Sequence, residues 1–377
     1  MELSKTFKFE KEARNFYFAY IIKYYEKTKK WEYTKDQTDD EEIIKIETQF
    51  IKTDPQKQKK DECNNHEGKK EEYVTLKQKS LKSLDSTNEN YSNSSKSDKS
   101  SNNYYFSNDY LKLEELKILT YNVWFDSYNW DNRCKAIFEI CEEKSPDVIC
   151  FQEVTNDFLN LLLSLKFIKD NYYITFPPNQ LKNWYDVIIL TKFKCNAYVV
   201  PFISRMGRKL IYICIQNNTT EIIKIGTVHL ESMNNSMIRE NQLISSFNIL
   251  DSKEIENICF KNTHNFLLGD FNFSEKENKF IYENNYTDVG LEILNKEINK
   301  SKNMDDKNNY WKKWCTMKEM KGYPAWRPDR ITYKTTSKTF TVKHFEIVGH
   351  LPIKILDKKN PVDTPSDHYG IYMECIL

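Results

Sequence analysis

The stretch HNFLLGDFN, residues 264–272, predicts a buried β-strand that ends in polar residues. Its centre is the apolar run of residues 266–268, and Asp270 and Asn272 follow where the strand would stop. The same design recurs along the chain as short β-rich runs, many of them followed or preceded by a polar group. The further runs span residues 117–124, 147–154, 172–176, 186–192, 210–216, 221–231, 329–334, 340–349 and 368–377. A sheet scaffold presents such strand-end groups at a shared rim.

Helical patterns lie between some of these strands, at residues 132–144, 156–165 and 236–250. Several other strands follow one another with only short links, which favours antiparallel pairing. We therefore expect an α/β domain built on mixed sheets, and not a TIM barrel or a Rossmann sheet. Residues 113–377 are long enough for one such domain.

The charge balance excludes a strongly basic nucleic-acid binder. The chain has 377 residues, with 56 Lys and Arg against 55 Asp and Glu, and residues 113–377 contain 34 of each sign. A polyanion would have to be bound by a local patch rather than by the overall field. Aromatic residues make up 14% of the chain while Gly (8) and Pro (10) are scarce, which excludes collagen-like and fully disordered chains.

The first part of the chain differs in composition from the rest. Apolar side chains at helical spacing predict a helix within residues 9–24, which would pack on its own domain or bind an unidentified partner. Residues 53–112 turn to Lys, Asn, Ser, Asp and Glu and predict a low-complexity linker. The expected division is a helical segment at 1–52, this linker, and a catalytic domain at 113–377.

The compartment is expected to be the nucleus or cytoplasm. The sequence start lacks a leader pattern, and the longest early apolar run, residues 16–22, is too short to span a bilayer, so no membrane association is expected. The nine cysteines are scattered without a CxxC pair, which favours reduced thiols over a disulfide framework or a zinc site.

The polar strand-end residues together suit the hydrolysis of a phosphate ester. Taken singly, a histidine after a strand is more often structural, and an aspartate at a strand end is more often a turn-forming residue. The set comprises Asn122, Gln152, Glu153, His229, Asp270, Asn272, Asp329, Arg330, Asp367 and His368. Glu153 could hold a hard cation such as Mg²⁺, and Asp270 beside Asn272 could orient and deprotonate the attacking water. His229, Asn122 and His368 could donate to phosphoryl oxygens as negative charge develops.

The order of these motifs resembles the endonuclease/exonuclease/phosphatase superfamily. That order is an Asn after the first strand, then QE, H, GDxN, D and a terminal SDH, and all appear here from Asn122 to His368. The resemblance implies a DNase I-like, four-layer sandwich of two packed sheets flanked by helices. It also implies that Glu153 and Asp270 form the metal site for Mg²⁺, with Mn²⁺ as an alternative, and that Asp270 exchanges the proton.

The same resemblance assigns the residues around the substrate. Asn122, His229, Ser232, Asn272 and His368 would surround the scissile phosphate, and Asp367 would orient His368. The other expected substrate contacts are Arg208, Tyr185, Trp326 and Arg330. Two departures from the family stand out. Trp124 occupies a position where many relatives carry an acid, and Phe273-Ser274 replaces a segment in which animal enzymes carry an Arg.

Five segments are most similar to the tyrosyl-DNA phosphodiesterase branch of this superfamily. They are YNVWFD (121–126), ICFQEVT (149–155), SRMGRKL (204–210), HLES (229–232) followed by Arg239 and Gln242, and PSDHYGI (365–371). The implied activity is hydrolysis of 5′-phosphotyrosyl-DNA bonds left by trapped topoisomerase II. DNA 5′ ends carrying a tyrosyl or peptide adduct would then be the partner. The alternatives are a phosphoinositide 5-phosphatase, a sphingomyelinase-like phosphodiesterase, another nuclease of the superfamily, or a scaffold without activity.

Overall fold

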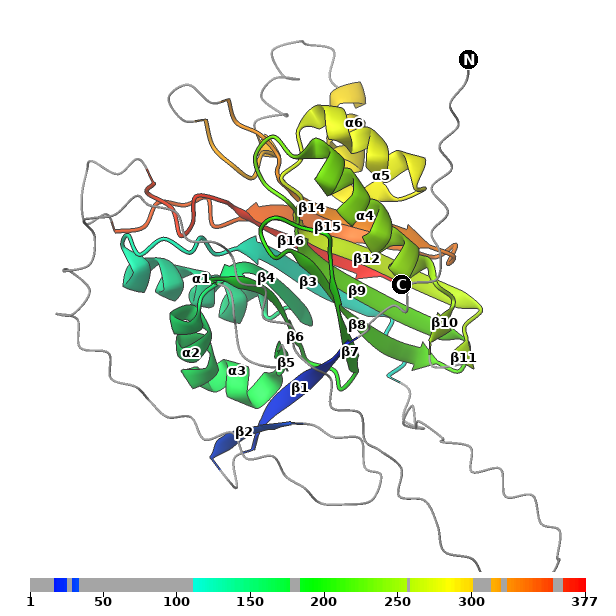
Figure 1. Cartoon of the computed structure of the whole chain (residues 1–377), viewed down its shortest axis with the longest axis horizontal. Coiled ribbons are helices and arrows are strands. Elements are labelled where there is room, and N and C mark those ends of the chain that lie inside the picture. Colours follow the sequence, from blue (N-terminus) through cyan, green and yellow to red (C-terminus); the bar gives the residue numbers. More distant parts are fainter. Residues whose placement is uncertain are drawn as a thin grey trace, which may run out of the picture. The chain divides into compact units, whose positions relative to one another are not determined.

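Two mixed β-sheets packed face to face form the centre of the fold (Figure 1). The computed structural model describes residues 17–25, 29–33, 111–176, 184–255, 258–300, 313–319, 324–354 and 362–377. One sheet has the order β13 (Thr287–Asp288), β14 (Asp329–Thr335), β12 (Asn262–Asp270), β9 (Glu221–His229), β8 (Lys209–Asn218) and β7 (Asn196–Pro201). The other has the order β5 (Tyr173–Phe176), β6 (Asp186–Thr191), β4 (Val148–Val154), β3 (Glu115–Asn122), β16 (Gly370–Ile376) and β15 (Thr341–Val348).

Each sheet contains one parallel pair among otherwise antiparallel strands, within the described residues. β9 and β12 are parallel in one sheet, and β3 and β4 are parallel in the other. Parallel neighbours end on the same side, and the register places His229 beside Asp270 and Asn122 beside Gln152. The two pairs also contact each other across the sheet interface. Four strand ends therefore meet at one edge of the sandwich, which we name the catalytic edge.

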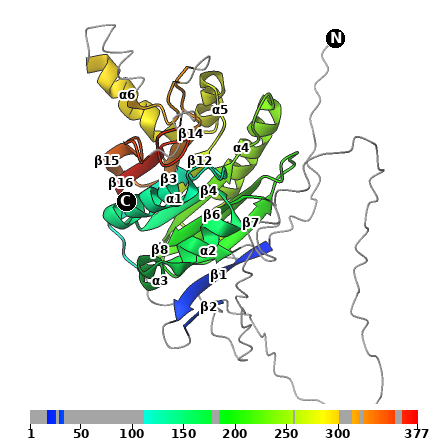
Figure 2. The same ribbon diagram turned by 90° about the vertical axis from the view of Figure 1, so that its left-hand side faces the viewer.

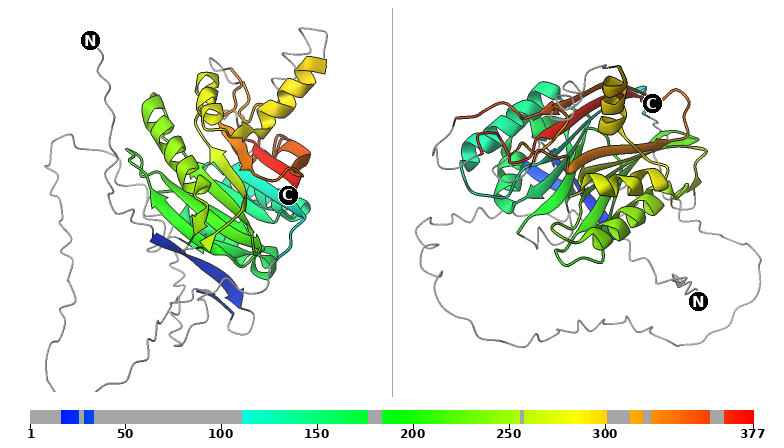
Figure 3. Two further views of the ribbon diagram at one scale, coloured as in Figure 1. Left: turned by 90° about the vertical axis from the view of Figure 1, so that its right-hand side faces the viewer. Right: turned by 90° about the horizontal axis from the view of Figure 1, so that it is seen from above.

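Alternating side chains divide each strand between an inner and an outer face. Ile118 and Leu268 belong to the core between the sheets, whereas their neighbours Leu119 and Leu267 face outward. Helices cover both outer faces (Figure 3). On the β3–β4 sheet these are α1 (Trp130–Lys144), α2 (Asn156–Ser164) and α3 (Lys166–Asn171), and on the β9–β12 sheet α4 (Ser236–Asp251), η1 (Glu275–Asn278) and α5 (Lys279–Glu283). The predicted four-layer, DNase I-like sandwich is confirmed.

The predicted strands and helices of the catalytic region agree with the observed ones to within a few residues. The prediction omitted β7, the short strands β10 (Glu254–Ile255), β11 (Ile258–Cys259) and β13, and the helices α3, η1, α5 and α6 (Val289–Lys300). α6 packs against β14 and adds Leu294 to the core. Its apolar residues Leu291, Leu294 and Ile298 do recur at helical spacing, so this signal was present in the sequence.

The N-terminal prediction is wrong for residues 17–24, which form a strand instead of a helix. β1 (Tyr17–Tyr25) pairs with β7 through its first part and with β5 through its centre, so it joins the edges of the two sheets (Figure 2). β2 (Lys30–Tyr33) pairs with the end of β1. Aromatic and β-branched residues dominate YFAYIIKYY and suit a strand in this context. Residues 9–16 and the predicted linker up to residue 110 lie outside the described residues.

Two smaller expectations concern thiols and membranes. The cysteines at the eight described positions are not joined in disulfides, and most of them are buried. Among the described helices, none combines the length and the apolar character needed to cross a bilayer.

Candidate active site

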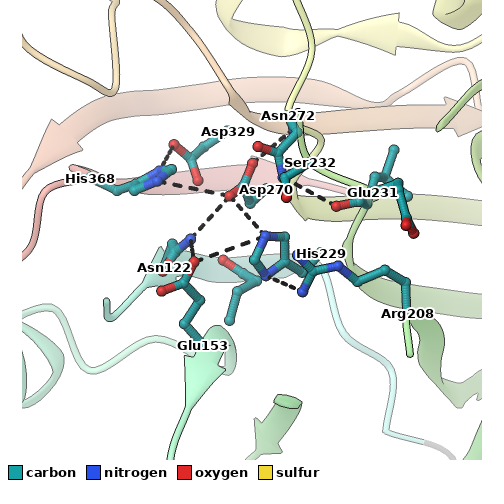
Figure 4. Close-up of polar contacts among 12 residues, drawn as sticks. Asn122, Glu153, Arg208, His229, Glu231, Ser232, Asp270, Asn272, Asp329 and His368 are labelled. Carbon is teal, nitrogen blue, oxygen red and sulfur yellow. Dashed lines mark hydrogen bonds and ion pairs between the residues drawn. The ribbon is translucent and has the colours of Figure 1, made fainter. Parts of the chain in front are cut away.

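The polar strand-end residues converge at the catalytic edge (Figure 4). Asn122 ends β3, Glu153 lies next to the end of β4, His229 ends β9 and Asp270 ends β12. Asp329 begins β14 directly opposite Asp270 in the antiparallel register. The loop before β16 adds His368. The structure thus brings together residues that lie up to about 250 positions apart, because the ends of two parallel pairs meet.

Two backbone features aim the acidic side chains. Gly269 has φ +128° before Asp270, and a Cβ at this position would lie 2.1 Å from the carbonyl oxygen of Val228. Glu153 has φ +60° in a bulge where the β4–β6 register shifts. Such a bulge re-directs a side chain from the alternation of its strand. The preceding Gln152 is fully buried and donates to Thr120 and Thr227, which ties the two sheets together beneath the site.

Asn122 bridges the two carboxylates at the centre of the site. Its Nδ2 lies 3.0 Å from Asp270 Oδ2 and 3.2 Å from Glu153 Oε1, and its Oδ1 accepts from the Trp124 amide. The backbone N–H of Asn272 donates to Asp270 Oδ1 at 2.8 Å, whereas its side-chain amide donates to the Leu230 carbonyl oxygen. Burial raises the pKa of Asp270, but the neighbouring histidines and these donors outweigh burial and leave that pKa lowered. Asp270 is therefore ionised.

His229 is neutral, and its proton lies on Nε2. Burial lowers the pKa of His229 to about 3, an effect that the Asp270 carboxylate only partly opposes. Arg208 Nη1 lies 3.0 Å from His229 Nδ1. Because a guanidinium only donates, Nδ1 must accept, so the ring proton of this neutral tautomer is on Nε2. Nε2 faces Asp270 Oδ2 at 3.4 Å.

His368 is the charged histidine of the site. Burial lowers its pKa, but the carboxylates of Asp329, Asp270 and Asp367 together raise the pKa well above the ordinary value. Its Nδ1 lies 2.8 Å from Asp329 Oδ2, and its Nε2 faces Asp270 Oδ2 at 3.8 Å. Asp329 also accepts from the buried Thr316 hydroxyl at 2.6 Å.

The orienting role expected of Asp367 therefore belongs to Asp329. Asp367 contacts Ser366 Oγ at 3.3 Å and acts on the His368 ring only through its charge. The turn at Ser366 explains why adjacency misleads here. The Ser366 hydroxyl donates to the Asn122 carbonyl and accepts from the His368 amide, which directs the ring toward β14.

Glu153 has the environment of a cation ligand. Its carboxylate is 12% exposed, and among the described residues its nearest basic side chain is the neutral His229, at 3.9 Å. Burial raises the pKa of Glu153 to about 7, and the charge of His368 opposes this only in part. Glu153, Asp270 and His229 offer ligand atoms within 4.8 Å of one another, and two of these residues supply carboxylate oxygens. An incompletely compensated carboxylate beside a second one fits a hard divalent cation.

Arg208 and Tyr185 form one wall of a pocket beside His229. This pocket is lined by Tyr185, Asp186, Val187, Met206, Gly207, Arg208, Lys209 and His229. The Arg208 guanidinium stands 5.4 Å from the Tyr185 ring centroid. Phe125 stacks on Tyr185 with the ring centroids 4.9 Å apart and the planes 2° from parallel, and Phe125 is 43% exposed. An accessible aromatic surface therefore borders the residues that are predicted to bind phosphate.

The remaining predicted substrate contacts divide into two groups. Ser232 lies at the edge and donates to Met206 Sδ at 3.1 Å, and the indole of Trp326 donates to Met317 Sδ at 3.0 Å. Arg330 is wrong as a substrate contact because its side chain is fully buried. Its Nε lies 2.9 Å from Asp288, and its Nη2 lies 3.2 Å from Asn278. Arg330 follows the edge residue Asp329 along β14, so its side chain points to the opposite face.

The prediction missed residues that hold the loops of the site. Arg133 on α1 donates five hydrogen bonds to carbonyl oxygens, of Val123, Trp124, Asp126, Tyr128 and Pro365. It therefore fixes the loop after Asn122 to the loop before His368. Glu231 is fully buried and accepts from Ser204, Arg205 and Gln242, which holds the loop that carries Arg208. A charged residue within an apolar helical or strand pattern was the available signal.

A model of the endonuclease/exonuclease/phosphatase family matches residues 119–368, about two thirds of the chain. None of the curated proteins matches the chain in sequence. Solved structures with the same fold include a humanized D. rerio TDP2 (tyrosyl-DNA phosphodiesterase 2), with a TM-score of 0.53 and 19% identity over 70% of this chain and 100% of that one. D. rerio TDP2 with a single strand DNA product has a TM-score of 0.51 and 20% identity over 70% of this chain and 99% of that one. Truncated Caenorhabditis elegans TDP2 has a TM-score of 0.51 and 18% identity over 70% of this chain and 98% of that one.

Proposed function

Since the chain belongs to the endonuclease/exonuclease/phosphatase family and is a metal-dependent phosphodiesterase, we propose that it hydrolyses 5′-phosphotyrosyl bonds at DNA ends. The observation that carries this proposal is the aromatic surface of Phe125 and Tyr185 beside His229 and Arg208. An aryl group or a nucleobase next to the scissile phosphate would stack on such a surface. The fold shared with TDP2 structures, one of which contains single strand DNA product, supports the same substrate class.

The resident groups suit an in-line attack by water. Asp270 is ionised and accepts the proton of the water, and the backbone N–H of Asn272 holds its Oδ1. His229 Nε2 and His368 Nε2 face Asp270 Oδ2 at 3.4 and 3.8 Å, longer than ordinary hydrogen bonds, so their N–H groups are donors available to phosphoryl oxygens. Asn122 would join them once its Nδ2 turns away from the two carboxylates that it now bridges. The charged His368 adds a full positive charge where negative charge develops.

Glu153 and Asp270 would hold the cation, which we take to be Mg²⁺, with Mn²⁺ as an alternative. The bound cation would supply Lewis-acid stabilisation of charge on a phosphoryl oxygen. The guanidinium of Arg208 adds a further positive charge, next to His229 Nδ1. It would face a phosphate or the group leaving it, while its hydrogen bond keeps the His229 proton on Nε2.

A net-neutral domain is compatible with a DNA end as the substrate. The catalytic region carries equal numbers of acidic and basic residues, so it lacks the field needed to hold long duplexes. A single-stranded end with few phosphate contacts and stacked bases requires no such field. The nucleus or cytoplasm is the compartment that this proposal requires.

The test compares four substrates with the purified full chain. They are a 5′-phosphotyrosyl oligonucleotide, the same oligonucleotide without the tyrosine, a phosphoinositide, and sphingomyelin, each with Mg²⁺ and with EDTA. We expect Mg²⁺-dependent release of tyrosine from the first substrate at the highest kcat/KM. Cleavage of a lipid without cleavage of the phosphotyrosyl oligonucleotide would refute the proposal. Glu153→Gln is the control for contaminating activity, because it removes the charge of the cation ligand and retains the side-chain volume.

A further inference from the structure

The sulfur of Met206 lies between two side chains that the proposed function places beside the substrate. Ser232 Oγ donates to Met206 Sδ at 3.1 Å, and Arg208 Nη2 donates to the same sulfur at 3.6 Å. Met206 is half-buried and lines the pocket beside His229. A thioether is a weak hydrogen-bond acceptor, so its use by two polar residues at an active site is unusual.

The backbone around Met206 is fixed. The amides of Met206 and Arg208 both donate to Ser204 Oγ, at 3.0 and 2.9 Å. The Ser204 hydroxyl donates to the fully buried Glu231 at 2.6 Å. Glu231 in turn accepts from the side-chain amide of Gln242 on α4. A change at the sulfur therefore cannot be absorbed by movement of the loop without loss of these contacts.

We propose that Met206 is a modification site at which a peroxide switches the phosphodiesterase off. A sulfur lone pair attacks one peroxide oxygen, the O–O bond breaks, and an S–O bond forms. The thioether is oxidised by two electrons to the sulfoxide, and hydrogen peroxide is reduced to water. The reaction is reversed by methionine sulfoxide reductase, with one enzyme for each sulfoxide epimer.

The geometry explains why oxidation inactivates the enzyme. A thioether sulfur has two lone pairs, and here they accept from Ser232 and from Arg208. Whichever lone pair forms the S–O bond, the new oxygen takes the place of one of the two donors. Arg208 also donates to His229 Nδ1, so its displacement removes the contact that fixes the His229 tautomer.

The chain provides matched controls close by. Met233 and Met237 are 79% and 76% exposed, so peroxide reaches them more readily than Met206. We assign neither side chain a role in catalysis. Cys259 is an exposed thiol and would account for any loss that thiol reductants restore.

The experiment treats the full chain with hydrogen peroxide and follows two quantities. Peptide mass spectrometry gives the sulfoxide fraction at each methionine, and hydrolysis of bis(p-nitrophenyl) phosphate gives the activity. We expect the lost activity to equal the sulfoxide fraction at Met206, and to return with methionine sulfoxide reductase but not with dithiothreitol. Met206→Leu should start with a lower kcat/KM and then resist peroxide, whereas the Met233→Leu/Met237→Leu variant should be inactivated like the wild type.

Two results would overturn the proposal. One is full activity in wild-type protein whose Met206 is largely oxidised, and this result does not depend on the folding of any variant. The other is equal peroxide sensitivity of folded Met206→Leu and wild type. Because the assay requires only phosphodiester hydrolysis, a failure on phosphotyrosyl DNA would refute the proposed substrate and leave this inference standing.

Discussion

Asp329 accepts the hydrogen bond from His368 Nδ1 at 2.8 Å, although 39 positions separate the two residues. The pair joins the start of β14 to the loop before β16, and it turns His368 Nε2 toward Asp270. The charge of Asp329 is also the largest of the influences that raise the pKa of His368. The adjacent Asp367 does neither to the same degree.

Asp329→Asn should therefore inactivate the enzyme far more than Asp367→Asn. Loss of the Asp329 charge lowers the pKa of His368, and the amide no longer selects the ring orientation. We expect kcat to fall by at least about 100-fold for Asp329→Asn, the size of a lost general acid-base or charge contribution. Asp367→Asn should lose about tenfold or less, because only a remote charge is removed. Steady-state kinetics with aryl phosphodiesters measure both, and equal losses in the two variants would contradict the assignment.

Cation binding should release a proton from Glu153 in a pH-dependent manner. Burial raises the pKa of Glu153 to about 7, so the metal-free protein holds this proton below pH 7. The carboxylate must lose it to bind a cation. Calorimetry of Mg²⁺ binding in buffers of different ionisation enthalpy should show close to one proton released at pH 6 and almost none at pH 8. The affinity for Mg²⁺ should rise with pH up to about 7 and then level off. Proton release that persists in Glu153→Gln would assign it to another group.

Gly269→Ala should cost at least about 2 kcal/mol of unfolding free energy, since strained backbone positions carry costs of this size. The φ of +128° excludes a side chain, and the added Cβ would meet the Val228 carbonyl oxygen. Asp270 would move with the backbone, so activity should fall as well. Gly226→Ala is the control, because its Cβ would meet the flexible ends of three leucine side chains, those of Leu210, Leu250 and Leu267, and no backbone atom among these nearest neighbours. Urea unfolding curves give both values. A similar loss of stability in the two variants would show that the backbone at Gly269 is not special.

Arg330→Ala should destabilise the fold and leave the KM of the folded fraction unchanged. Removing Arg330 takes away one of the two arginines that pair with the buried Asp288 and leaves Arg327, and broken buried ion pairs cost about 3–5 kcal/mol. Thermal unfolding and KM with a phosphotyrosyl oligonucleotide separate the two effects. Arg205→Ala provides the comparison, because Arg205 is an exposed arginine at the same edge and should change stability little. An elevated KM with normal stability in Arg330→Ala would restore Arg330 to the substrate site.

The catalytic edge was predictable because its information is local. Asn122, Glu153, His229 and Asp270 each follow a β-rich run, and strand ends of parallel pairs meet on one side. The partner of His368 was not predictable in this way. The sequence places Asp367 beside it, and only the register of β14 against β12 brings Asp329 within reach.

Periodicity alone was also insufficient at β1. Tyr17, Ile21 and Tyr24 have helical spacing, yet the same segment is rich in residues that favour strands. The free edges of β5 and β7 decide between the two, and these edges exist only once both sheets have formed. Glu231 and Arg133 were overlooked for a related reason, because their role is to hold together loops that meet only in the folded chain.

The position of β1 also affects how far the chain can be shortened and still remain monomeric. A protein beginning at residue 113 would keep all residues of the catalytic edge and lose the strand that covers β5 and β7. Two open strand edges would then be available for pairing with another molecule. Such a shortened enzyme should be active when dilute and self-associate when concentrated, and a peptide with the sequence of β1 should keep it monomeric.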